Sequence, residues 1–339
     1  MWALRVHGPN DLRMEEVPQP QAGPGEVVVR VAAAGICHTD LEVISGEHGA
    51  ILRGLTKYPI TPGHEWAGYV TDVGEGVAGL HEGDLVVGET GIGCLRCRLC
   101  LTGHHNLCPQ GTETGILRRD GAMREYHVQR ADFVHRFPVD DPELAALVEP
   151  ASVGVYACLK TAVTPLDRVA VVGGGSIGQF CAQAAKVFGA RHVAMVTRSE
   201  PKLRLARELG ADETVNSKEV DLAEWAGLFD VVIEAAGTAG AFRDALQLGG
   251  CTSRIGVVGL SGREPVAAME TLIDREQTII GVRGSPNVYP QTVELLAQGK
   301  LQGRKIISHR FAIDEYQEAF ALAKRGGAEV MKIMLVMGT

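Results

Sequence analysis

The sequence lacks the features that nucleic-acid-binding, secreted and membrane-spanning proteins require. Its 339 residues carry a formal net charge of −8, whereas a protein that binds phosphate backbones needs a basic surface. It contains no block of like charges that would indicate an interaction tail. The first 18 residues have no apolar core and carry early acidic residues, which argues against a secretory signal, and no apolar run approaches membrane-spanning length. We therefore expect a cytoplasmic protein that binds neither nucleic acid nor membrane.

The chain is long enough for two domains, and its two halves differ in their pattern of apolar residues. Residues 1 to about 148 contain short β-branched runs separated by glycine and proline, which predict a β-rich domain with strands near 25–35, 67–77 and 83–89. From about residue 165, short apolar strands alternate with helical stretches, which predicts a parallel sheet built from βαβ units. The strands expected there cover 167–172, 192–196, 229–237, 253–260 and 277–284, and a helix is expected at 202–211. The final apolar run, 330–336, has no obvious place in that sheet.

A glycine-rich loop follows the first of these parallel strands and opens a helix. In its spacing, Gly173 permits a tight turn, Gly175 lets a pyrophosphate approach the backbone, and Gly178 lets helix and strand pack closely. The free N–H groups of Ser176 and Ile177 then point at the phosphates. A plain strand-to-helix turn is the alternative, but the order of strand, loop and helix favours a dinucleotide-binding site.

The end of the second parallel strand lacks the acidic residue that often grips the ribose hydroxyls of NAD. Thr197 stands there and Arg198 follows it. Without a carboxylate to repel a 2′-phosphate, and with a planar guanidinium to clamp one, this pair favours NADP over NAD, with Ser199 and Lys202 as further contacts. The alternative is that Ser199 caps the next helix and Arg198 is a solvated surface residue.

Four of the eight cysteines lie within one short segment, at Cys94, Cys97, Cys100 and Cys108. In a cytoplasmic chain, cysteines with this spacing are more often metal ligands than disulfide partners. Four thiolates so close together fit a closed, tetrahedral zinc site that stabilises a loop. An iron–sulfur cluster uses a related spacing and is the alternative.

Other potential metal ligands are scattered along the first 150 residues. Cys37 lies in GICHTD (35–40), His64 and Glu65 lie in TPGHEWAG (61–68), and Glu149 lies in LVEPASVG (147–154). Taken singly, each has an ordinary structural explanation, such as a core cysteine or a helix-capping carboxylate. Their spacing alone does not unite them in one site.

The motifs together resemble the zinc-containing medium-chain dehydrogenase/reductase family, in particular its sorbitol (polyol) and threonine dehydrogenase branch. They follow the family's order over nearly the whole chain and comprise 35–40, 61–68, 83–89, the four-cysteine segment, 120–128, 147–154, the glycine loop and 307–320. The resemblance implies an α/β protein with a GroES-like, β-rich catalytic domain at 1–148 and 285–339, including a structural-zinc lobe at about 90–110. It also implies an inserted Rossmann domain, a doubly wound parallel sheet, at 149–284.

The resemblance also implies roles for the scattered ligands. Cys37, His64 and Glu149 bind the catalytic zinc, and Glu65 lies close enough to enter the coordination when substrate is absent. Asp40 orients His64 from outside the metal's ligands. Thr39 takes the proton of the substrate alcohol through its hydroxyl.

Two positions depart from the family's pattern. Glu42 stands three residues beyond Thr39, where a histidine often continues the proton path, and a carboxylate there shifts the pH dependence. Gly284 and Ser285 stand where sorbitol enzymes carry an arginine–tyrosine pair that contacts the polyol, with Arg283 displaced by one position. Sorbitol itself is therefore a doubtful substrate.

The combined prediction is a zinc-dependent, NADP-preferring alcohol dehydrogenase. It oxidises a secondary alcohol of a polyol, cyclitol or amino-alcohol to a ketone by hydride transfer. L-threonine 3-dehydrogenase and 2,3-butanediol dehydrogenase activities are the alternatives. A zinc-free quinone or enone reductase and a non-catalytic nicotinamide-nucleotide-binding protein are less favoured, because the ligand set is complete. By resemblance, we expect a homodimer or homotetramer.

Overall fold

The computed structural model describes residues 1–259 and 269–338. The chain divides into two compact units: unit 1 contains Met1–Glu149, Tyr289–Gly299 and Ile307–Thr339, and unit 2 contains Pro150–Val288 and Lys300–Ile306. This division differs from the sequence-based boundaries in three ways. Glu149 belongs to unit 1, the long segment of unit 2 runs on to Val288, and the short segment Lys300–Ile306 returns to unit 2.

The main sheet of unit 1 is built around β3 (Glu26–Ile36), whose valines and alanines are largely buried. Its strands follow the order β10-β5-β4-β3-β18-β17, and β9 also pairs with β3. A cluster that includes Val27, Val29, Val31 and Trp66 fills the core beside it. Each such buried valine contributes about 1.5–3 kcal/mol through removal of apolar surface from water. The other strands are β4 (Glu65–Val73), β5 (Leu85–Gly88), β9 (Tyr126–Arg130), β10 (Val134–Arg136), β17 (Ile307–Ala312) and β18 (Lys332–Val336).

The strand expected at 67–77 begins and ends earlier than its sequence pattern indicated. It covers Glu65–Val73, and the glycines that follow it form a turn, with Gly76 at φ 80°. A left-handed backbone of this kind ends a strand and favours glycine. The earlier start matters for the site, because it places Glu65 in the first position of β4.

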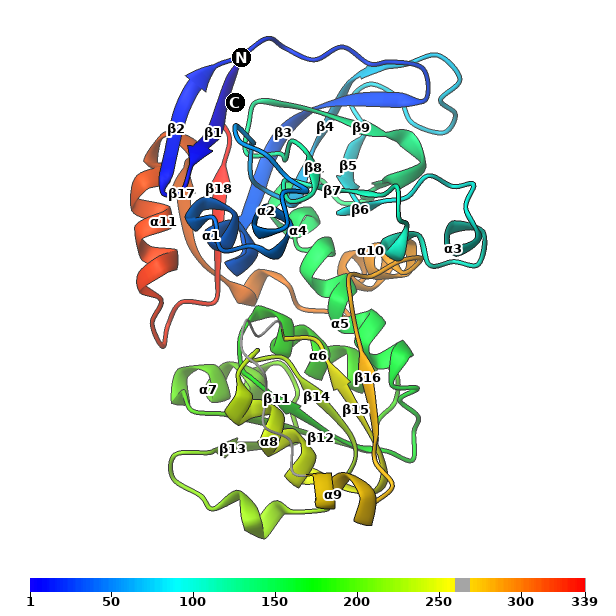
Figure 1. Cartoon of the computed structure of the whole chain (residues 1–339), viewed down its shortest axis with the longest axis vertical. Coiled ribbons are helices and arrows are strands. Elements are labelled where there is room, and N and C mark those ends of the chain that lie inside the picture. Colours follow the sequence, from blue (N-terminus) through cyan, green and yellow to red (C-terminus); the bar gives the residue numbers. More distant parts are fainter. Residues whose placement is uncertain (260–268, 339) are drawn as a thin grey trace. The chain divides into compact units, whose positions relative to one another are not determined.

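The last strand of the chain completes the sheet of unit 1. β18 pairs antiparallel with β3, where Ile333 lies opposite Ile36, and parallel with β17. Figure 1 shows the red C-terminal strand beside the blue β3. Lys332, the first residue of β18, is thereby brought next to the segment that leads to Cys37.

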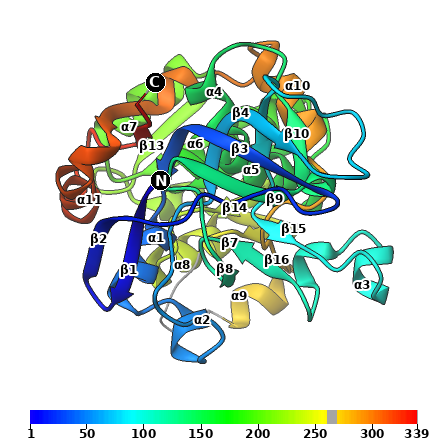
Figure 2. The same ribbon diagram turned by 90° about the horizontal axis from the view of Figure 1, so that it is seen from above.

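Smaller elements surround this sheet. β1 (Trp2–Gly8) and β2 (Asp11–Glu16) form a hairpin, and β6 (Gly91–Ile92), β7 (Thr112–Thr114) and β8 (Arg118–Arg119) form a small sheet at the base of the four-cysteine lobe. The lobe stands out from the rest of unit 1 in both views (Figures 1 and 2). The helices of unit 1 are α1 (His38–Ser45), α2 (Gly49–Leu52), α3 (Arg98–Leu101), η1 (His105–Leu107), η2 (Ala131–Phe133), α4 (Pro142–Ala146), α10 (Tyr289–Ala297), η5 (Ile313–Glu315) and α11 (Tyr316–Arg325), and α5 (Val148–Lys160) continues into unit 2.

Unit 2 is a Rossmann fold. Its six parallel strands follow the order β13-β12-β11-β14-β15-β16, which is the 3-2-1-4-5-6 order of doubly wound dinucleotide-binding sheets. The central strand β11 (Arg168–Val172) is buried almost throughout, as expected for a parallel strand covered on both faces. The other strands are β12 (His192–Thr197), β13 (Glu213–Asn216), β14 (Phe229–Glu234), β15 (Gly249–Val257) and β16 (Thr278–Gly281).

The helices that connect these strands are α6 (Ser176–Val187), α7 (Glu200–Glu208), η3 (Leu222–Trp225), α8 (Ala239–Leu248) and α9 (Met269–Asp274). η4 (Arg304–Ile306) lies in the returning segment Lys300–Ile306. The fourth expected strand, 253–260, begins earlier, at Gly249, and its last residue, Leu260, lies outside the described residues. Within residues 1–259 and 269–338, the helices lack the combination of length and apolar character that crossing a bilayer requires.

Candidate metal centres and dinucleotide loop

The four cysteines of the lobe converge on one point. The Sγ atoms of Cys94 and Cys100 lie 3.9 Å apart, and those of Cys97 and Cys108 lie 3.8 Å apart. Four sulfurs at the corners of a tetrahedron, each about 2.3 Å from a central zinc, are separated by about 3.8 Å. The spacing therefore matches a single tetrahedral ion, whereas a cluster of several iron atoms holds its thiolates farther apart.

The backbone of the lobe also prepares these sulfurs for a metal. N–H groups of Arg96 and Cys97 point at Cys94 and lower the pKa of its thiol to about 6. The Cys94 N–H in turn donates to the Cys108 sulfur at 3.4 Å. Gly93 is required here, because a Cβ at that position would lie 2.8 Å from the Cys100 sulfur.

A buried carboxylate joins the lobe to the body of unit 1. Glu89 Oε2 lies 2.8 Å from His105 Nε2, in the lobe, and Glu89 Oε1 lies 2.9 Å from His135 Nε2, on β10. Burial opposes ionisation of Glu89, but the two histidines outweigh it and lower the pKa of this carboxyl. Sequence reasoning missed this anchor, because the three residues follow no recognisable spacing.

A second group of ligand atoms comes from two separate segments. Cys37 is the N-cap residue of α1, His64 immediately precedes β4, and Glu65 begins it. The ligand atoms of these three residues all lie within 4.8 Å of one another. Cys37 is partly exposed, whereas His64 and Glu65 are buried.

Asp40 holds this group in place from behind. Its carboxylate is fully buried and accepts hydrogen bonds from the backbone N–H of Cys37 at 2.9 Å and of Gly63 at 3.0 Å. The same carboxylate lies 3.4 Å from His64 Nδ1. Burial opposes protonation of His64, but Asp40 and Cys37 outweigh it and raise the pKa of the imidazole well above its usual range. With Nδ1 facing Asp40, Nε2 is the nitrogen left for a metal.

The two candidate glutamates differ in their surroundings. Glu65 belongs to the group of ligand atoms, and its Oε1 lies 2.6 Å from the Lys332 ammonium. Glu149 lies outside the group, and its Oε1 accepts a hydrogen bond from the Thr90 hydroxyl at 2.9 Å. Burial raises the pKa of Glu149, and the nearby Glu65 raises it further, although His64 opposes the shift. The residues brought together are therefore Cys37, His64 and Glu65, with Glu149 beside them.

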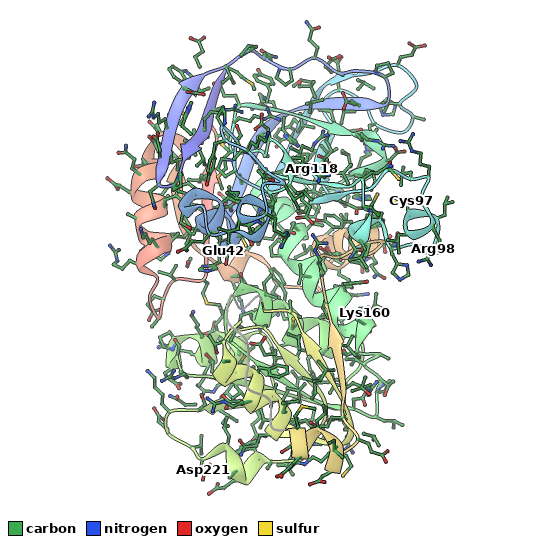
Figure 3. The ribbon with its side chains drawn as sticks, viewed as in Figure 1. Glu42, Cys97, Arg98, Arg118, Lys160 and Asp221 are labelled. Atoms are coloured by element: carbon green, nitrogen blue, oxygen red, sulfur yellow. The ribbon has the colours of Figure 1, made fainter. Side chains whose placement is uncertain are left out.

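The residues expected to move protons lie on α1 and just beyond it. Thr39 and Glu42 are one turn apart on this helix, and both are partly exposed. Figure 3 marks Glu42 on α1. Glu42 Oε1 lies 3.9 Å from His38 Nε2, and the Glu42 carbonyl accepts the N–H of His48 at 3.1 Å. His48, which sequence reasoning missed, is half-buried within electrostatic range of Glu42 and His64, and burial lowers its pKa.

The glycine loop of unit 2 has the geometry that close backbone packing demands. Gly173 has φ 113°, and a Cβ there would lie 2.8 Å from backbone atoms of Ala235 and Ala236. A Cβ on Gly178 would collide with the Gly173 carbonyl oxygen. Gly175 is the N-cap residue of α6 and faces open space, so that the N–H groups of Ser176 and Ile177 begin the helix beside it.

The segment after β12 leaves polar groups available. Thr197 ends the strand, and its side chain packs against Gly174, where a Cβ would lie 2.9 Å from the Thr197 Cγ2 atom. Arg198 is exposed and within electrostatic range of Asp244 on α8. Ser199 occupies the N-cap position of α7 but makes no capping hydrogen bond, and its buried hydroxyl has no partner among the described residues.

Comparisons with known proteins identify the family. Residues 23–139 match the family described as alcohol dehydrogenase GroES-like domain, and residues 176–298 match the family described as zinc-binding dehydrogenase. The chain is 33% identical to sorbitol dehydrogenase of Bacillus subtilis (strain 168) over 344 residues, covering 99% of this chain and 97% of that protein. The chain belongs to the zinc-containing medium-chain dehydrogenase/reductase family.

Solved structures of the family agree with this assignment. A zinc-binding dehydrogenase from Sinorhizobium meliloti 1021 bound to NADP superposes with a TM-score of 0.91 at 29% identity, covering 99% of this chain and 98% of that one. Galactitol-1-phosphate dehydrogenase from Escherichia coli superposes with a TM-score of 0.90 at 28% identity, covering 99% and 100%. The fold class is confirmed, and the chain is a zinc- and nicotinamide-nucleotide-dependent alcohol dehydrogenase of the polyol branch.

The donor atoms of both centres fit the zinc that this dehydrogenase family uses. The four-thiolate site is closed, as structural zinc sites are. The second group offers a thiol, an imidazole and a carboxylate, a mixed set typical of catalytic zinc, which retains one open position. Glu65 Oε2 is buried without a hydrogen-bond partner among the described residues, as expected of a carboxylate oxygen beside an ion.

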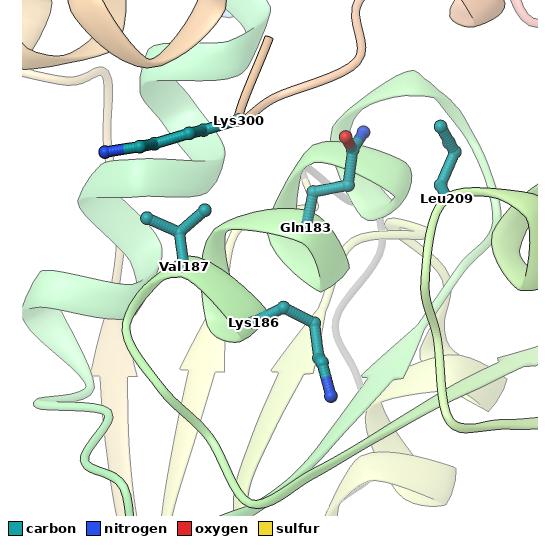
Figure 4. Close-up of a pocket in the computed structure, with 5 residues that line it drawn as sticks. All are labelled: Gln183, Lys186, Val187, Leu209 and Lys300. Carbon is teal, nitrogen blue, oxygen red and sulfur yellow. The ribbon is translucent and has the colours of Figure 1, made fainter. Parts of the chain in front are cut away.

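A surface pocket of unit 2 lies apart from the coenzyme loop. It has a volume of about 380 Å³ and is lined by Gln183, Lys186, Val187, Leu209 and Lys300. In Figure 4 the two ammonium groups point in different directions, and Lys186 is paired with Asp212 at 2.9 Å. The pocket lies at the end of α6 opposite the glycine loop, about 16 Å along the helix. Its lining residues do not converge on a ligand.

Proposed function

We propose that this dehydrogenase oxidises a secondary alcohol of a polyol, cyclitol or amino-alcohol to a ketone, with NADP preferred to NAD. The observation that carries the proposal is the group formed by Cys37, His64 and Glu65 in a chain that also has a dinucleotide loop. The names of the relatives, sorbitol dehydrogenase and galactitol-1-phosphate dehydrogenase, support a polyhydroxylated substrate. L-threonine 3-dehydrogenase and 2,3-butanediol dehydrogenase activities remain the alternatives.

In this proposal Cys37, His64 and Glu149 are the ligands of the catalytic zinc, and Glu65 is an exchangeable fourth ligand. Bound zinc lowers the pKa of an alcohol that reaches its open position. Asp40 fixes the His64 ring so that Nε2 faces the metal, because its carboxylate lies beside Nδ1. The Thr90 hydroxyl orients Glu149 through a hydrogen bond of 2.9 Å.

The proton of the alcohol leaves along α1. Thr39 accepts it at its hydroxyl and passes its own proton on, and Glu42, one turn along the helix, receives it. His38 lies 3.9 Å from Glu42, and its side chain is exposed, so it can hand the proton to solvent. The hydride acceptor is the nicotinamide ring of the coenzyme.

The preference for NADP depends on the segment after β12. Thr197 carries no charge to repel a 2′-phosphate, and the buried Ser199 hydroxyl is unpaired among the described residues. Arg198 supplies a guanidinium beside it, and Lys202, whose pKa is lowered by burial, supplies an ammonium. Solved relatives bind either coenzyme, NADP in the one from Sinorhizobium meliloti and NADH in an alcohol dehydrogenase from Escherichia coli CFT073, so the preference rests on the residues of this segment.

The substrate differs from sorbitol in this proposal. Gly284 has φ 59°, a backbone conformation that an arginine or tyrosine adopts only with strain. Ser285 is buried, and its Oγ lies 2.5 Å from Ser152 Oγ, so it is used within unit 2. A polyol contact of the sorbitol type is therefore missing, and a cyclitol, a small diol or an amino-alcohol is favoured.

We expect the protein to act as a homodimer or homotetramer. β16 is an edge strand of the Rossmann sheet, and the Ile279 side chain on it is exposed. An exposed apolar edge favours pairing with a second copy. The expected partner is a small-molecule alcohol, and neither nucleic acid nor a membrane is expected to bind.

The test is a rate assay on zinc-loaded protein that follows the absorbance of reduced nicotinamide. Polyols, cyclitols, threonine and 2,3-butanediol are each offered with NADP and with NAD. The proposal predicts turnover of at least one of these alcohols and a higher kcat/KM with NADP. Higher kcat/KM with NAD would remove the coenzyme preference, and binding of coenzyme without turnover of any alcohol would contradict the proposed reaction.

A further inference from the structure

A lysine from the last strand of the chain is buried against the catalytic group. Only 3% of the Lys332 side chain and 1% of the Glu65 side chain are exposed. The Lys332 ammonium lies 2.6 Å from Glu65 Oε1 and donates a second hydrogen bond to the Ile36 carbonyl at 3.2 Å. These contacts lie within unit 1, where β18 and β3 are neighbouring strands (Figure 1).

Burying an ammonium group this deeply lowers the stability of the fold unless its partners compensate. Removing it from water costs several kcal/mol, which its partners must offset. Burial opposes the charge of Lys332, but Glu65, with Cys37 and Glu149, outweighs burial and raises the pKa of the ammonium. The ion pair with Glu65 at 2.6 Å places the ammonium within the same group of ligands.

The two oxygens of Glu65 have different surroundings. Oε1 is held by Lys332, whereas Oε2 is buried and has no hydrogen-bond partner among the described residues. Gly35 leaves the space that Oε2 occupies, because a Cβ on that glycine would collide with this oxygen. The Glu65 carboxylate is thus held in place by the Lys332 ammonium at Oε1, and Oε2 fills the space left by the absent side chain of Gly35.

This seating creates a competition for one carboxylate. A zinc ion held by Cys37 and His64 would attract the Glu65 carboxylate, whose Oε1 the Lys332 ammonium already holds at 2.6 Å. A thiolate and two carboxylates would bring more negative charge than one divalent ion carries, so the buried Lys332 ammonium would also offset excess negative charge at the site. Removal of Lys332 leaves zinc as the remaining cation beside Glu65, which strengthens and prolongs their bond.

We propose that Lys332 is a positioning residue that holds Glu65 beside the catalytic zinc and competes with the metal for its carboxylate. Lys332 thereby sets how readily Glu65 enters and leaves the metal's coordination, and so how readily the alcohol finds an open position. This inference rests on the proposed zinc site and assigns a role to a residue outside the ligand set.

The experiment measures release of zinc from the holoenzyme to a coloured chelator. Lys332→Met should slow release from the catalytic site roughly tenfold, the scale on which residues behind a metal's ligands change its affinity. Release from the four-cysteine site in the same sample should not change and serves as an internal control. Lys186→Met, which removes a surface ammonium paired with Asp212, should leave both rates unchanged.

A dependence on Glu65 separates this role from a merely structural one. In a Glu65→Gln background, Lys332→Met should no longer alter zinc release. In the native background it should also raise KM for the alcohol more than it lowers kcat, because Glu65 then occupies the substrate's position. Release at the native rate or faster, or an effect that persists without the Glu65 carboxylate, would overturn the proposal.

If Lys332→Met does not fold, Lys332→Arg tests the same competition for the Glu65 carboxylate. A guanidinium can hold both oxygens of a carboxylate, so zinc should leave faster than from the native protein, and this effect too should vanish with Glu65→Gln. Unchanged or slower release would contradict the competition. If the proposed zinc site at Cys37 does not exist, Cys37→Ser would leave the zinc content of the protein unchanged. That result distinguishes failure of the zinc site from failure of the role proposed for Lys332.

Discussion

Replacing Ser199 by alanine should weaken the binding of NADP without weakening the binding of NAD. The hydroxyl is buried, makes no capping bond to α7 and has no partner among the described residues. A hydroxyl that donates to a phosphate makes a charge-assisted hydrogen bond worth about 1.5–3 kcal/mol. We therefore expect KM for NADP to rise about 10- to 150-fold. NAD has no 2′-phosphate, so its KM should not change.

The same substitution should leave the coenzyme-free protein as stable as before, or slightly more stable. A buried hydroxyl without a partner contributes no bond that alanine would lose. Thr238 offers a matched control, because its hydroxyl accepts the Ala241 N–H at 3.1 Å and so caps α8. Thr238→Ala should lower the free energy of unfolding by about 0.5–2 kcal/mol, the usual value for a lost cap.

Two measurements on both variants check this reasoning. Steady-state kinetics with NADP and with NAD give the change in coenzyme preference, and urea unfolding of the coenzyme-free protein gives the change in stability. Equal changes in KM for the two coenzymes would refute the role of Ser199 at the 2′-phosphate. A loss of stability as large as that of Thr238→Ala would instead identify Ser199 as an ordinary helix cap.

Three further predictions concern unit 1. Glu89→Leu should lower the free energy of unfolding in guanidinium chloride by about 3–5 kcal/mol, because it leaves His105 and His135 without their buried partner, and a loss below about 1 kcal/mol would contradict this. The two histidines outweigh burial and lower the pKa of Glu89 below its ordinary 4.5. The ionised carboxylate therefore contributes its full stabilisation above pH 4.5, and this stabilisation is lost as the pH falls through the lower pKa of the folded protein. The Glu89→Leu variant should lack this pH-dependent part of the stability. Cys97→Ser should remove one zinc ion per chain and speed proteolysis within 90–110 while coenzyme affinity persists, and an unchanged zinc content would count against the four-thiolate site. Glu42→Gln should slow alcohol oxidation and alter its pH profile with zinc retained, and identical rates at every pH would exclude Glu42 from the proton path.

The elements that sequence alone predicted well are those whose chemistry is local. The glycine loop follows its strand and opens its helix within a few residues, and the spacing itself dictates the packing, as the contact between Gly178 and the Gly173 carbonyl illustrates. The four cysteines likewise lie within one short segment, so their spacing predicted that they would meet. Parallel strands were recognised from short apolar runs, because strands buried on both faces need apolar residues throughout.

The arrangement of the catalytic group required the structure. Lys332 and Glu65 are 267 positions apart, and the pairing of β18 with β3 is what brings them together. The resemblance implied Glu149 as a ligand with Glu65 close by, whereas the structure has Glu65 inside the group of ligand atoms and Glu149 outside it. The positions of the two carboxylates depend on their side-chain partners, which are Thr90 for Glu149 and Lys332 for Glu65. No local sequence pattern encodes these pairings.

The return of Lys300–Ile306 to unit 2 was equally invisible in the sequence. The Gln302 N–H donates to the side chain of Gln183 on α6 at 2.7 Å, which ties this short segment to the Rossmann fold. Glu149 and the boundary near Val288 were displaced from expectation for a related reason. Helix α5 runs through the first boundary without interruption, so the change of unit falls inside a helix, at Pro150, and not in a loop that the sequence pattern would reveal.

The most direct test of the account is the zinc content and alcohol oxidation of Cys37→Ser beside the native protein. The account predicts two zinc ions per native chain, one for each group of ligands, and one zinc ion in the variant. The variant should bind coenzyme with native affinity and oxidise no alcohol that the native protein oxidises. A variant that keeps both zinc ions, or that turns over alcohol at the native rate, would contradict a catalytic zinc at Cys37.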